Sequence, residues 1–418
     1  MELKKYLTSI GRLAKEASYG AMCLSTKAKN LALNDMAKSL CTHKDGILKA
    51  NGIDVRAALK KKLPAPFIDR LQLNGKRIRA MADSLAAIAK LDDPVGEVIK
   101  AWRRPNGLWI HKVRVPIGVI AIIYESRPNV TSDCIGLCVK SGNSVILRGG
   151  SEAMNSNLGI YASVKGPLKK HRIHAGMVNM VATDDRRAID VLLGLTEYID
   201  LIMPRGGEGL IERVTQASRI PVIKHYKGIC AVYVDEAADL TMAREVCFNA
   251  KVQRPGVCNA METMLVHARI AKEFLASMLA DFRKARVEIR GCPETRRLFK
   301  GVKAATRTDY RTEFLDLILS VKVVKDVSEA AAHINAYGSH HSDSIITEDY
   351  RNALTFLRNV DSACVYVNAS TRFTDGYEFG MGAEIGISTD KLHARGPVAL
   401  EELTTYKYMV LGKGQVRT

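Results

Sequence analysis

Residues 115–147 read VPIGVIAIIYESRPNVTSDCIGLCVKSGNSVIL, and this stretch decides the fold class. Residues 115–124 form a continuous apolar run, which predicts a strand buried on both faces. Residues 131–140 have helical spacing, and residues 144–147 are again apolar. A buried strand, a helix and a second buried strand in succession indicate a parallel β-α-β unit.

The same alternation extends along the chain in both directions from this stretch. Residues 1–95 are predicted to be helical, with apolar residues at helical spacing over 68–91. The elements expected after residue 147 are helices at 155–170, 188–195 and 210–218 and strands at 178–182, 199–203 and 221–223. The predicted fold class is therefore α/β, with a parallel sheet covered by helices on both faces.

Two segments lie outside this alternation. Residues 98–115 predict a β-hairpin around Arg104-Pro105-Asn106-Gly107, since Asn-Gly is a strong hairpin turn signal. Residues 405–411 alternate in polarity and predict a further strand near the C-terminus. The edges of such strands need covering, either by a partner subunit or by the chain's own body.

A single cysteine stands on a turn in residues 251–263, KVQRPGVCNAMET. A helix is expected to end near Lys251, and a strand is expected over 264–266. Most free cysteines are buried and inert, but Pro255-Gly256 and the small residues after the thiol leave room beside it. Cys258 is therefore the candidate nucleophile, and its neighbour Asn259 is the second candidate catalytic residue.

Composition limits the remaining possibilities. The chain has 418 residues, 47% of them hydrophobic, and nine cysteines without a Cys-x-x-Cys pair. We expect no disulfide framework and no metal site. With no secretion signal and no membrane-spanning run, the expected location is the cytoplasm. The net charge of +18 is spread through the chain, which favours a solvated surface that attracts anionic small molecules over a nucleic-acid-binding protein.

Two expected strand ends are rich in glycine. The first reads Arg148-Gly149-Gly150-Ser151 and the second reads Arg205-Gly206-Gly207. Glycines let the backbone approach a phosphate, and the following helix N-terminus and the arginine favour its charge. Together they predict a nucleotide cofactor, although neither a G-x-G-x-x-G fingerprint nor a Walker lysine motif is present.

The sequence resembles the gamma-glutamyl phosphate reductases, a branch of the aldehyde dehydrogenase superfamily. The resemblance covers nearly the whole chain. The motifs that carry it are VPIGV at 115–119, IYESRPNVT at 123–131, KSGNSVILRGG at 140–150, PRGG at 204–207, the Cys258 segment, GAEIGIST at 382–389 and HARGP at 393–397. Ala231 and Gly256 depart from the usual family pattern, which has His and often Ser there.

The resemblance implies a division of the chain into three parts. Residues 1–97 and 116–225 would form the NADPH-binding domain, and residues 226–393 the catalytic domain, each with a mainly parallel sheet. Residues 98–115 and 394–418 would form a β arm and tail used in homo-oligomerisation.

It also implies roles for single residues. Arg148 and Ser151 fall where other members contact the adenosine ribose, and a Ser beside an Arg leaves room for the 2′-phosphate of NADPH. Glu152, one residue on, counts against that preference. Glu313 falls where the superfamily binds the nicotinamide ribose.

The activity implied is reduction of L-glutamyl 5-phosphate to L-glutamate 5-semialdehyde in proline biosynthesis, through a thioester on Cys258. The Cys258 backbone N–H would stabilise the oxyanion, with Arg127 or Asn129 as second donor. Arg127 or Lys224 would hold the phosphate or the substrate carboxylate. Residues 222–228 contain no carboxylate that would activate water against the thioester.

Two alternative functions and one possible partner remain to be considered. An aldehyde dehydrogenase that acylates coenzyme A would share Cys258 and lack the base. A basic RNA-binding or scaffold protein is disfavoured, because no aromatic-basic binding motif is present. A glutamate kinase that supplies the labile substrate is a possible partner.

Overall fold

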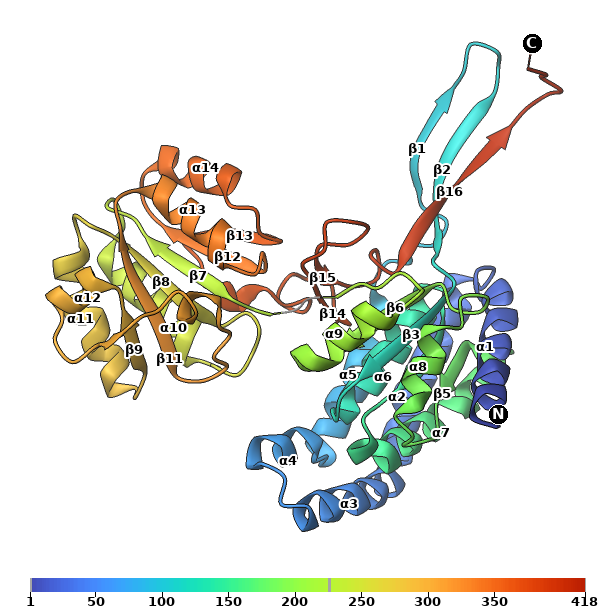
Figure 1. The fold of residues 1–418 in the computed structure, drawn as a ribbon. Coiled ribbons are helices and arrows are strands. Elements are labelled where there is room, and N and C mark those ends of the chain that lie inside the picture. The colour runs from blue at the N-terminus through green and yellow to red at the C-terminus, as the bar shows by residue number, and fades with distance from the viewer. Residues whose placement is uncertain (1, 225–226, 418) are drawn as a thin grey trace. The chain divides into compact units, whose positions relative to one another are not determined.

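The computed structural model describes residues 2–224 and 227–417 and consists of two compact units (Figure 1). Unit 1 is built from Met1–Lys224, Gly380–Gly386 and Val398–Thr418, and unit 2 from His225–Phe379 and Ile387–Pro397. Each unit has its own parallel sheet, so the predicted α/β class is confirmed.

The N-terminal part of unit 1 is helical, as predicted. Its helices are α1 (Glu2–Ala21), α2 (Thr26–Thr42), α3 (Lys44–Lys60), α4 (Ala65–Leu71) and α5 (Gly75–Lys90). The helical pattern over 68–91 is divided between α4 and α5. Asn74 causes the break, because its side chain accepts a hydrogen bond from the Arg77 N–H at 2.8 Å and thereby caps a new helix.

The sheet of unit 1 has four parallel strands in the order β5-β4-β3-β6. The strands are β3 (Val119–Tyr124), β4 (Ser144–Arg148), β5 (Val178–Met180) and β6 (Leu201–Arg205). The helices between and after them are α6 (Pro128–Lys140), α7 (Met154–Lys170), α8 (Arg187–Leu193) and α9 (Glu208–Ala217), with short 3-10 turns η1 (Ser151–Ala153) and η2 (Ala175–Met177). The strand expected at 221–223 is reduced to one isolated bridge between Ile202 and Val222.

The apolar run 115–124 is not one strand, contrary to the prediction. The chain breaks at Gly118, whose φ is +131°, and a Cβ there would lie 2.2 Å from Asp200 Oδ2. That carboxylate accepts the Val119 N–H at 2.8 Å. The glycine therefore lets the chain leave one sheet and enter the next at a point where any side chain would clash.

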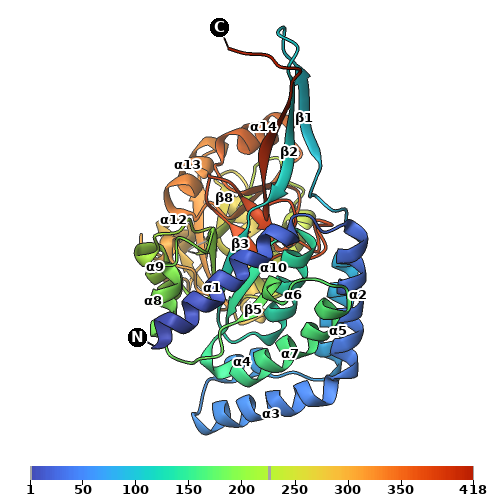
Figure 2. The ribbon, with the colours of Figure 1, turned by 90° about the vertical axis from the view of Figure 1, so that its right-hand side faces the viewer.

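The residues before Gly118 belong to a separate antiparallel sheet, which projects from the body of unit 1 (Figures 1 and 2). Its strands are β1 (Val98–Arg103), β2 (Trp109–Pro116) and β16 (Thr404–Leu411), in the order β1-β2-β16. The predicted hairpin is confirmed. Its turn centres on Pro105 and Asn106, because proline presets the first turn position and Gly107 takes the left-handed conformation at φ +90°.

The tail strand pairs with the chain's own hairpin. β16 lies antiparallel to β2 along its whole length, from Thr404 opposite Pro116 to Leu411 opposite Trp109. Apart from Thr404, every residue of β16 is exposed. The hairpin therefore covers one edge of the tail strand, and the sheet presents an exposed surface that includes apolar side chains.

Unit 2 contains a seven-stranded, entirely parallel sheet in the order β10-β9-β11-β8-β7-β12-β13. The strands are β7 (Cys230–Val234), β8 (Met261–His267), β9 (Glu288–Gly291), β10 (Lys303–Ala304), β11 (Ile318–Val324), β12 (Ser342–Ile346) and β13 (Cys364–Val367). The other elements are α10 (Leu240–Val252), α11 (Ala271–Lys284), α12 (Pro293–Leu298), α13 (Val327–Tyr337), α14 (Tyr350–Asn359), η3 (Asp309–Arg311), η4 (Thr371–Phe373) and the short pair β14 (Gly386–Ser388) and β15 (Gly396–Val398).

Helices cover both faces of this sheet. Phe274 and Phe282 of α11 pack with α10 on one face, and Ile334 of α13 and Phe356 of α14 pack on the other. Full burial of side chains of this size stabilises the fold by about 1.5–3 kcal/mol each. The strands between the two layers are thereby fixed, and the loops at their ends have a rigid base.

Candidate active site

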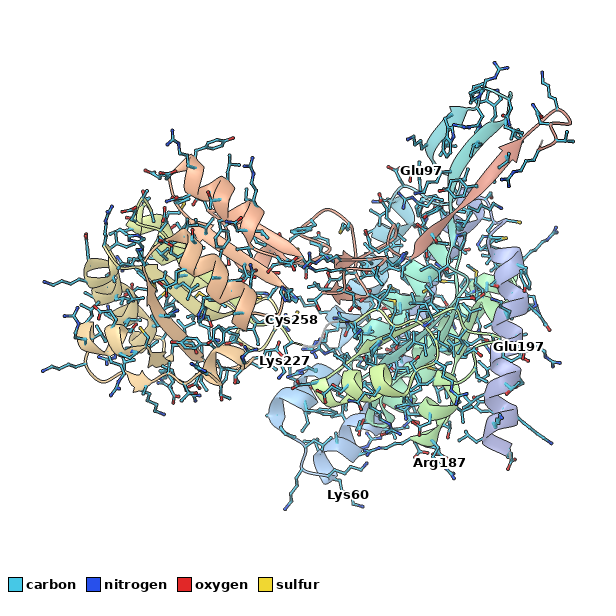
Figure 3. The ribbon with its side chains drawn as sticks, turned by 45° about the horizontal axis from the view of Figure 1, so that its top comes forward. Lys60, Glu97, Arg187, Glu197, Lys227 and Cys258 are labelled. Carbon is cyan, nitrogen blue, oxygen red and sulfur yellow. The ribbon has the colours of Figure 1, made fainter. Side chains whose placement is uncertain are left out.

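Cys258 lies on the loop that joins the end of α10 to the start of β8, in unit 2 (Figure 3). Its side chain is partly exposed. The loop precedes its strand, so the thiol stands at the amino-terminal edge of the parallel sheet. The expected helix before the loop and strand after it are both present.

Gly228 packs directly against the backbone of Cys258. A Cβ on Gly228 would lie 1.9 Å from the Cys258 carbonyl oxygen and 2.5 Å from its Cα. Only a residue without a side chain fits, because backbone atoms cannot yield as the end of a flexible side chain can. The segment before β7 thus fixes the position of the Cys258 loop.

Glu313 reaches the same place from the loop between η3 and β11. Its Oε1 accepts the Gly228 N–H at 2.9 Å. The structure therefore brings two residues singled out in the sequence, Cys258 and Glu313, to the same glycine. The connection between them runs through the backbone of Gly228.

A buried ion pair lies behind the loop. Lys251 Nζ of α10 is 2.6 Å from Glu262 Oε2 of β8, and the two side chains are 0% and 1% exposed. Glu262 Oε1 also accepts the Leu315 N–H at 3.1 Å, two residues beyond Glu313. Burial raises the pKa of Glu262 and lowers that of Lys251. The pair ties both ends of the Cys258 loop to the Glu313 loop.

The side chain of Asn259 is buried and serves as a support. Its Nδ2 donates to the backbone carbonyl oxygens of Thr374 at 2.8 Å and Arg372 at 3.3 Å. The backbone carbonyl oxygen of Asn259 accepts the Thr371 hydroxyl at 2.8 Å. Both amide hydrogens are therefore used by the segment around η4. An oxyanion role for this side chain would require it to give up one of these bonds.

A second thiol lies beneath the first. Cys230 Sγ donates to the Cys258 carbonyl oxygen at 3.3 Å, and burial raises the pKa of the Cys230 thiol well above its usual value. Cys230 is fully buried, whereas Cys258 is partly exposed. Accessibility therefore favours Cys258 as the nucleophile. Cys134 and Cys138 are fully buried in α6.

In unit 1, the segment Arg148 to Ser151 follows β4 at the carboxyl-terminal edge of the sheet. Arg148 is 6% exposed, its Nη1 donates to the Gly149 carbonyl oxygen at 3.0 Å, and its buried Nε has no partner. Burial lowers the pKa of Arg148. A Cβ on Gly149 would lie 2.1 Å from Asn157 Nδ2, and one on Gly150 would lie 2.6 Å from Ser126 Oγ.

Glu152 lies against this segment. Its Oε2 accepts the Ser126 hydroxyl at 3.0 Å, and hydrogen bonds, including one from Ser151, hold its pKa below the usual range despite burial. A carboxylate thus stands beside the residues expected to meet the cofactor ribose. The same carboxylate raises the pKa of Arg148, the direction opposite to burial.

The second glycine segment follows β6. The Gly207 N–H donates to Glu125 Oε1 at 3.0 Å, and a Cβ on Gly206 would lie 2.7 Å from the Glu125 carboxyl carbon. The N-terminus of α9, expected to receive a phosphate, therefore has a carboxylate of this chain beside it. Arg205 packs on Gly386, which would place a Cβ 3.2 Å from Arg205 Cδ.

The three residues proposed as oxyanion donors or substrate ligands, Arg127, Asn129 and Lys224, also belong to unit 1. Arg127 and Asn129 are exposed at the start of α6, after β3, where Arg127 is the N-cap residue. Asn129 hydrogen-bonds Asp133, whose pKa burial raises to about 6. Lys224 is partly exposed after the Ile202–Val222 bridge. The segments after β3, β4 and β6 share one edge, since β3 pairs with both other strands.

The sequence analysis missed Gly228, Lys251, Glu262 and Arg372. One signal was available for the ion pair, because Lys251 ends the buried face of a helix and Glu262 interrupts an apolar strand. For Gly228 and Arg372 no local pattern existed. In the described ranges 2–224 and 227–417, no group of three or more His, Cys, Asp or Glu residues could hold a metal ion, and no helix could span a membrane.

A thiol on a loop of one α/β unit and glycine-rich strand ends on another define the aldehyde dehydrogenase class. The profile of the aldehyde dehydrogenase family matches residues 68–296. An acetylating aldehyde dehydrogenase from Geobacillus thermoglucosidasius shares the fold at a TM-score of 0.69 with 15% identity, covering 100% of this chain and 98% of that one.

Within this class the chain belongs to the gamma-glutamyl phosphate reductase family. It is 55% identical over 417 residues to the gamma-glutamyl phosphate reductase of Thermodesulfovibrio yellowstonii, which covers 100% of both chains. The crystal structure of gamma-glutamyl phosphate reductase from Thermotoga maritima matches with a TM-score of 0.97 and 49% identity, covering 99% of this chain and 100% of that one. The resemblance read from the sequence motifs is thus confirmed.

Proposed function

We propose that the protein reduces L-glutamyl 5-phosphate to L-glutamate 5-semialdehyde with release of phosphate, as a step of proline biosynthesis. The observation that carries the proposal is a partly exposed Cys258 on a loop fixed by Gly228, in a chain 55% identical to gamma-glutamyl phosphate reductases. The distant likeness to acylating aldehyde dehydrogenases, at about 15% identity, does not favour coenzyme A as the acyl acceptor.

The chemistry follows from the thiol. The Cys258 thiolate attacks the acyl carbon, a carbon–sulfur bond forms, and the carbon–oxygen bond to phosphate breaks as phosphate departs with the electron pair. The Cys258 backbone N–H is the proposed oxyanion donor, and Arg127 or Asn129 the proposed second donor. After hydride reaches the thioester carbon, the carbon–sulfur bond breaks and the aldehyde leaves with the thiolate restored.

The cofactor of this class is a nicotinamide nucleotide, which supplies hydride when bound. We assign it to unit 1, where Gly149 and Gly150 leave no room for a side chain and Arg148 keeps a buried Nε without a partner. NADPH is the preferred form, because a guanidinium without a carboxylate ion-pair partner in the described residues suits a 2′-phosphate. Ser151, Arg205, Gly206, Gly207 and Glu313 are the remaining residues proposed to contact it.

Four further proposals concern the assembly, the substrate supply, a substrate ligand and the location of the enzyme. The exposed sheet of β1, β2 and β16 is proposed as the surface for homo-oligomerisation. A glutamate kinase is the proposed supplier of the substrate, and Lys224 is a proposed substrate ligand. None of the nine cysteines forms a disulfide in the part of the chain that the structure describes, which favours a reducing compartment, the cytoplasm.

A spectrophotometric assay of the reverse direction tests the reaction. Glutamate semialdehyde with NADP⁺ should yield NADPH only when phosphate is present, because residues 222–228 contain no carboxylate to activate water. Turnover without phosphate would contradict the mechanism. Turnover with coenzyme A in place of phosphate would favour the acylating alternative.

Two variants test the nucleophile. Cys258→Ala should fold and bind NADPH but lose essentially all activity, and Cys258→Ser should be nearly inactive, since an oxygen ester is a poorer hydride acceptor than a thioester. Cys292→Ala is the matched control, because Cys292 is another partly exposed thiol of unit 2. Substantial reduction by folded Cys258→Ala would exclude Cys258 as the nucleophile.

A further inference from the structure

The side chain of Arg372, in η4, contacts the loop that carries Cys258. Its Nε donates to Gln253 Oε1 at 2.9 Å, and its Nη1 donates to Asn259 Oδ1. These two partners stand five residues before Cys258 and one residue after it. The guanidinium is thus held against both sides of the Cys258 loop, within one unit of the molecule.

Arg372 has no carboxylate ion-pair partner among the residues that the structure describes. Both side-chain partners are neutral amide oxygens, and no carboxylate within residues 2–224 and 227–417 forms an ion pair with it. Other partly buried arginines of unit 2 differ. Arg290 pairs with Glu288 and Asp309, and Arg395 pairs with Asp361. A partly buried cation without a counter-ion costs stability unless a ligand provides the charge.

Neighbouring charged groups act on the pKa of Arg372 in both directions. Burial lowers the pKa of Arg372 most, and Arg254 of the same loop lowers it further, whereas Cys258 and Asp375 act in the opposite direction. The Asp375 carboxylate is engaged elsewhere, because its Oδ1 accepts the N–H groups of Tyr377 and Glu378. The second terminal nitrogen of Arg372, Nη2, has no hydrogen bond with the described residues.

The Cys258 loop does not lie at a helix N-terminus, so no helix dipole provides positive charge there. Helix N-termini attract anions, but Cys258 follows the C-terminal end of α10, where the helix dipole is negative. An anion near this thiol therefore depends on side chains. Arg372 is already fixed by two hydrogen bonds, so little rotamer entropy is lost when it takes a ligand.

We propose that Arg372 binds an anionic group of the acyl phosphate substrate, the phosphoryl group or the α-carboxylate, through its Nη2 edge. The proposal rests on the proposed function, since that reaction brings a substrate with two anionic ends to Cys258. Arg372 then has two tasks: it supports the loop through Gln253 and Asn259, and it contacts the substrate.

The test compares Arg372→Ala and Arg372→Lys with Arg358→Ala, a charge-matched control on the exposed surface of α14. The reverse reaction is measured with phosphate and semialdehyde varied in turn. Loss of a charge-assisted hydrogen bond corresponds to about a tenfold to hundredfold change in affinity. We expect Arg372→Ala to raise KM by that factor for one of the two anions, Arg372→Lys to recover part of it, and Arg358→Ala to match the unmodified protein.

The substrate whose KM rises identifies the group. A rise for phosphate alone assigns the phosphoryl group, and a rise for semialdehyde alone assigns the α-carboxylate. Unchanged KM values for both, with a fall in kcat that Lys does not rescue, would show that Arg372 only supports the loop and would overturn the proposal.

A second measurement does not depend on turnover. Inorganic phosphate or L-glutamate should slow alkylation of Cys258 by iodoacetamide, and Arg372→Ala should abolish this protection by one of them. Full protection in Arg372→Ala by both anions would overturn the proposal even if the assay shows no activity. Absence of turnover in the unmodified protein would instead contradict the proposed function.

Discussion

The two units use opposite ends of their parallel sheets. In unit 1 the glycine-rich segments follow β4 and β6, whereas in unit 2 Cys258 precedes β8 and Glu313 precedes β11. After a strand of a parallel sheet the chain enters a helix, so helix N-termini with partial positive charge gather at the carboxyl edge. At the amino edge helices end. A phosphate site at one edge can use backbone dipoles, and a site at the other needs cationic side chains.

Arg148 and Arg372 show the same contrast. Each is at least partly buried, and each lacks a carboxylate ion-pair partner in the described part of the chain. Arg148 stands beside Gly149 and Gly150, which let the backbone approach a phosphate closely. Arg372 stands on a loop fixed by side chains, with Gln253 and Asn259 holding the guanidinium. An arginine without a carboxylate ion-pair partner thus marks the proposed ligand position in both units.

Apart from the Cys258 variants, the largest expected effect comes from Gly228→Ala, which tests how rigidly the unit 2 loop is held. The added methyl would lie 1.9 Å from the Cys258 carbonyl oxygen, so the backbone must move and the thiol must leave its position. Activity should fall at least about a hundredfold, because catalysis is sensitive to displacements of about 1 Å. The spectrophotometric assay of the reverse reaction, with phosphate present, measures this activity.

Gly256→Ala is the matched control on the same loop. A Cβ there would meet nothing closer than the Leu315 carbonyl oxygen at 3.6 Å, which is ordinary contact. Similar losses in both variants would mean that the close approach of Gly228 is not the cause.

The next effect concerns the buried ion pair behind that loop. Lys251→Met should lower the free energy of unfolding by about 3–5 kcal/mol, since it leaves the Glu262 carboxylate buried without its partner. Adding Glu262→Gln should recover much of the loss, because the amide oxygen still accepts the Leu315 N–H. Urea unfolding measures both.

Lys29→Met provides the comparison in unit 1. Lys29 pairs with Asp93 at 3.0 Å and is 0% exposed, but it belongs to α2. We expect a similar stability loss with unchanged alkylation of Cys258 by iodoacetamide, whereas Lys251→Met changes that rate. Equal alkylation rates in both variants would show that the Lys251 pair is purely structural.

Arg148→Ala tests unit 1 directly. NADPH binding should weaken by about 1.5–3 kcal/mol, the range for a charge-assisted hydrogen bond, and NADH binding should hardly change. Fluorescence titration of both nucleotides measures it, with the exposed Arg12→Ala as control. An equal loss for both nucleotides would mean that Arg148 shapes the loop and does not select the 2′-phosphate.

The smallest effect is a pH dependence at Asp343 of β12. Burial raises its pKa to about 7, although Ala231 N–H and Ser362 hydroxyl donate to it at 2.7 and 2.5 Å. Between its unfolded pKa near 3.8 and about 7, only the folded chain holds the proton, so its contribution to stability falls as pH rises through that window.

Asp343→Asn removes this penalty. The urea midpoint of the variant relative to the unmodified protein should therefore be higher at pH 8 than at pH 4. A difference that does not change with pH would show that Asp343 is ionised in the folded protein throughout.

Local patterns were sufficient for most elements and for placing Cys258 on an accessible turn. The strands and helices between residues 119 and 217 follow the predicted order because a parallel β-α-β chain requires apolar runs and helical spacing in each segment. The break at Gly118 was missed because the residues around it are apolar on both sides. It depends on the Asp200 carboxylate, a residue 81 positions from Val119.

The sequence by itself determined the α/β class, the family, the hairpin and the thiol on a turn, because each depends on neighbouring residues. Only the tertiary structure decided that Gly228 meets both Cys258 and Glu313 and that Arg372 meets Asn259 across 113 positions. Such pairs form where elements distant in sequence pack together, and their geometry follows from the packing of a whole sheet. No pattern of spacing along the chain encodes it.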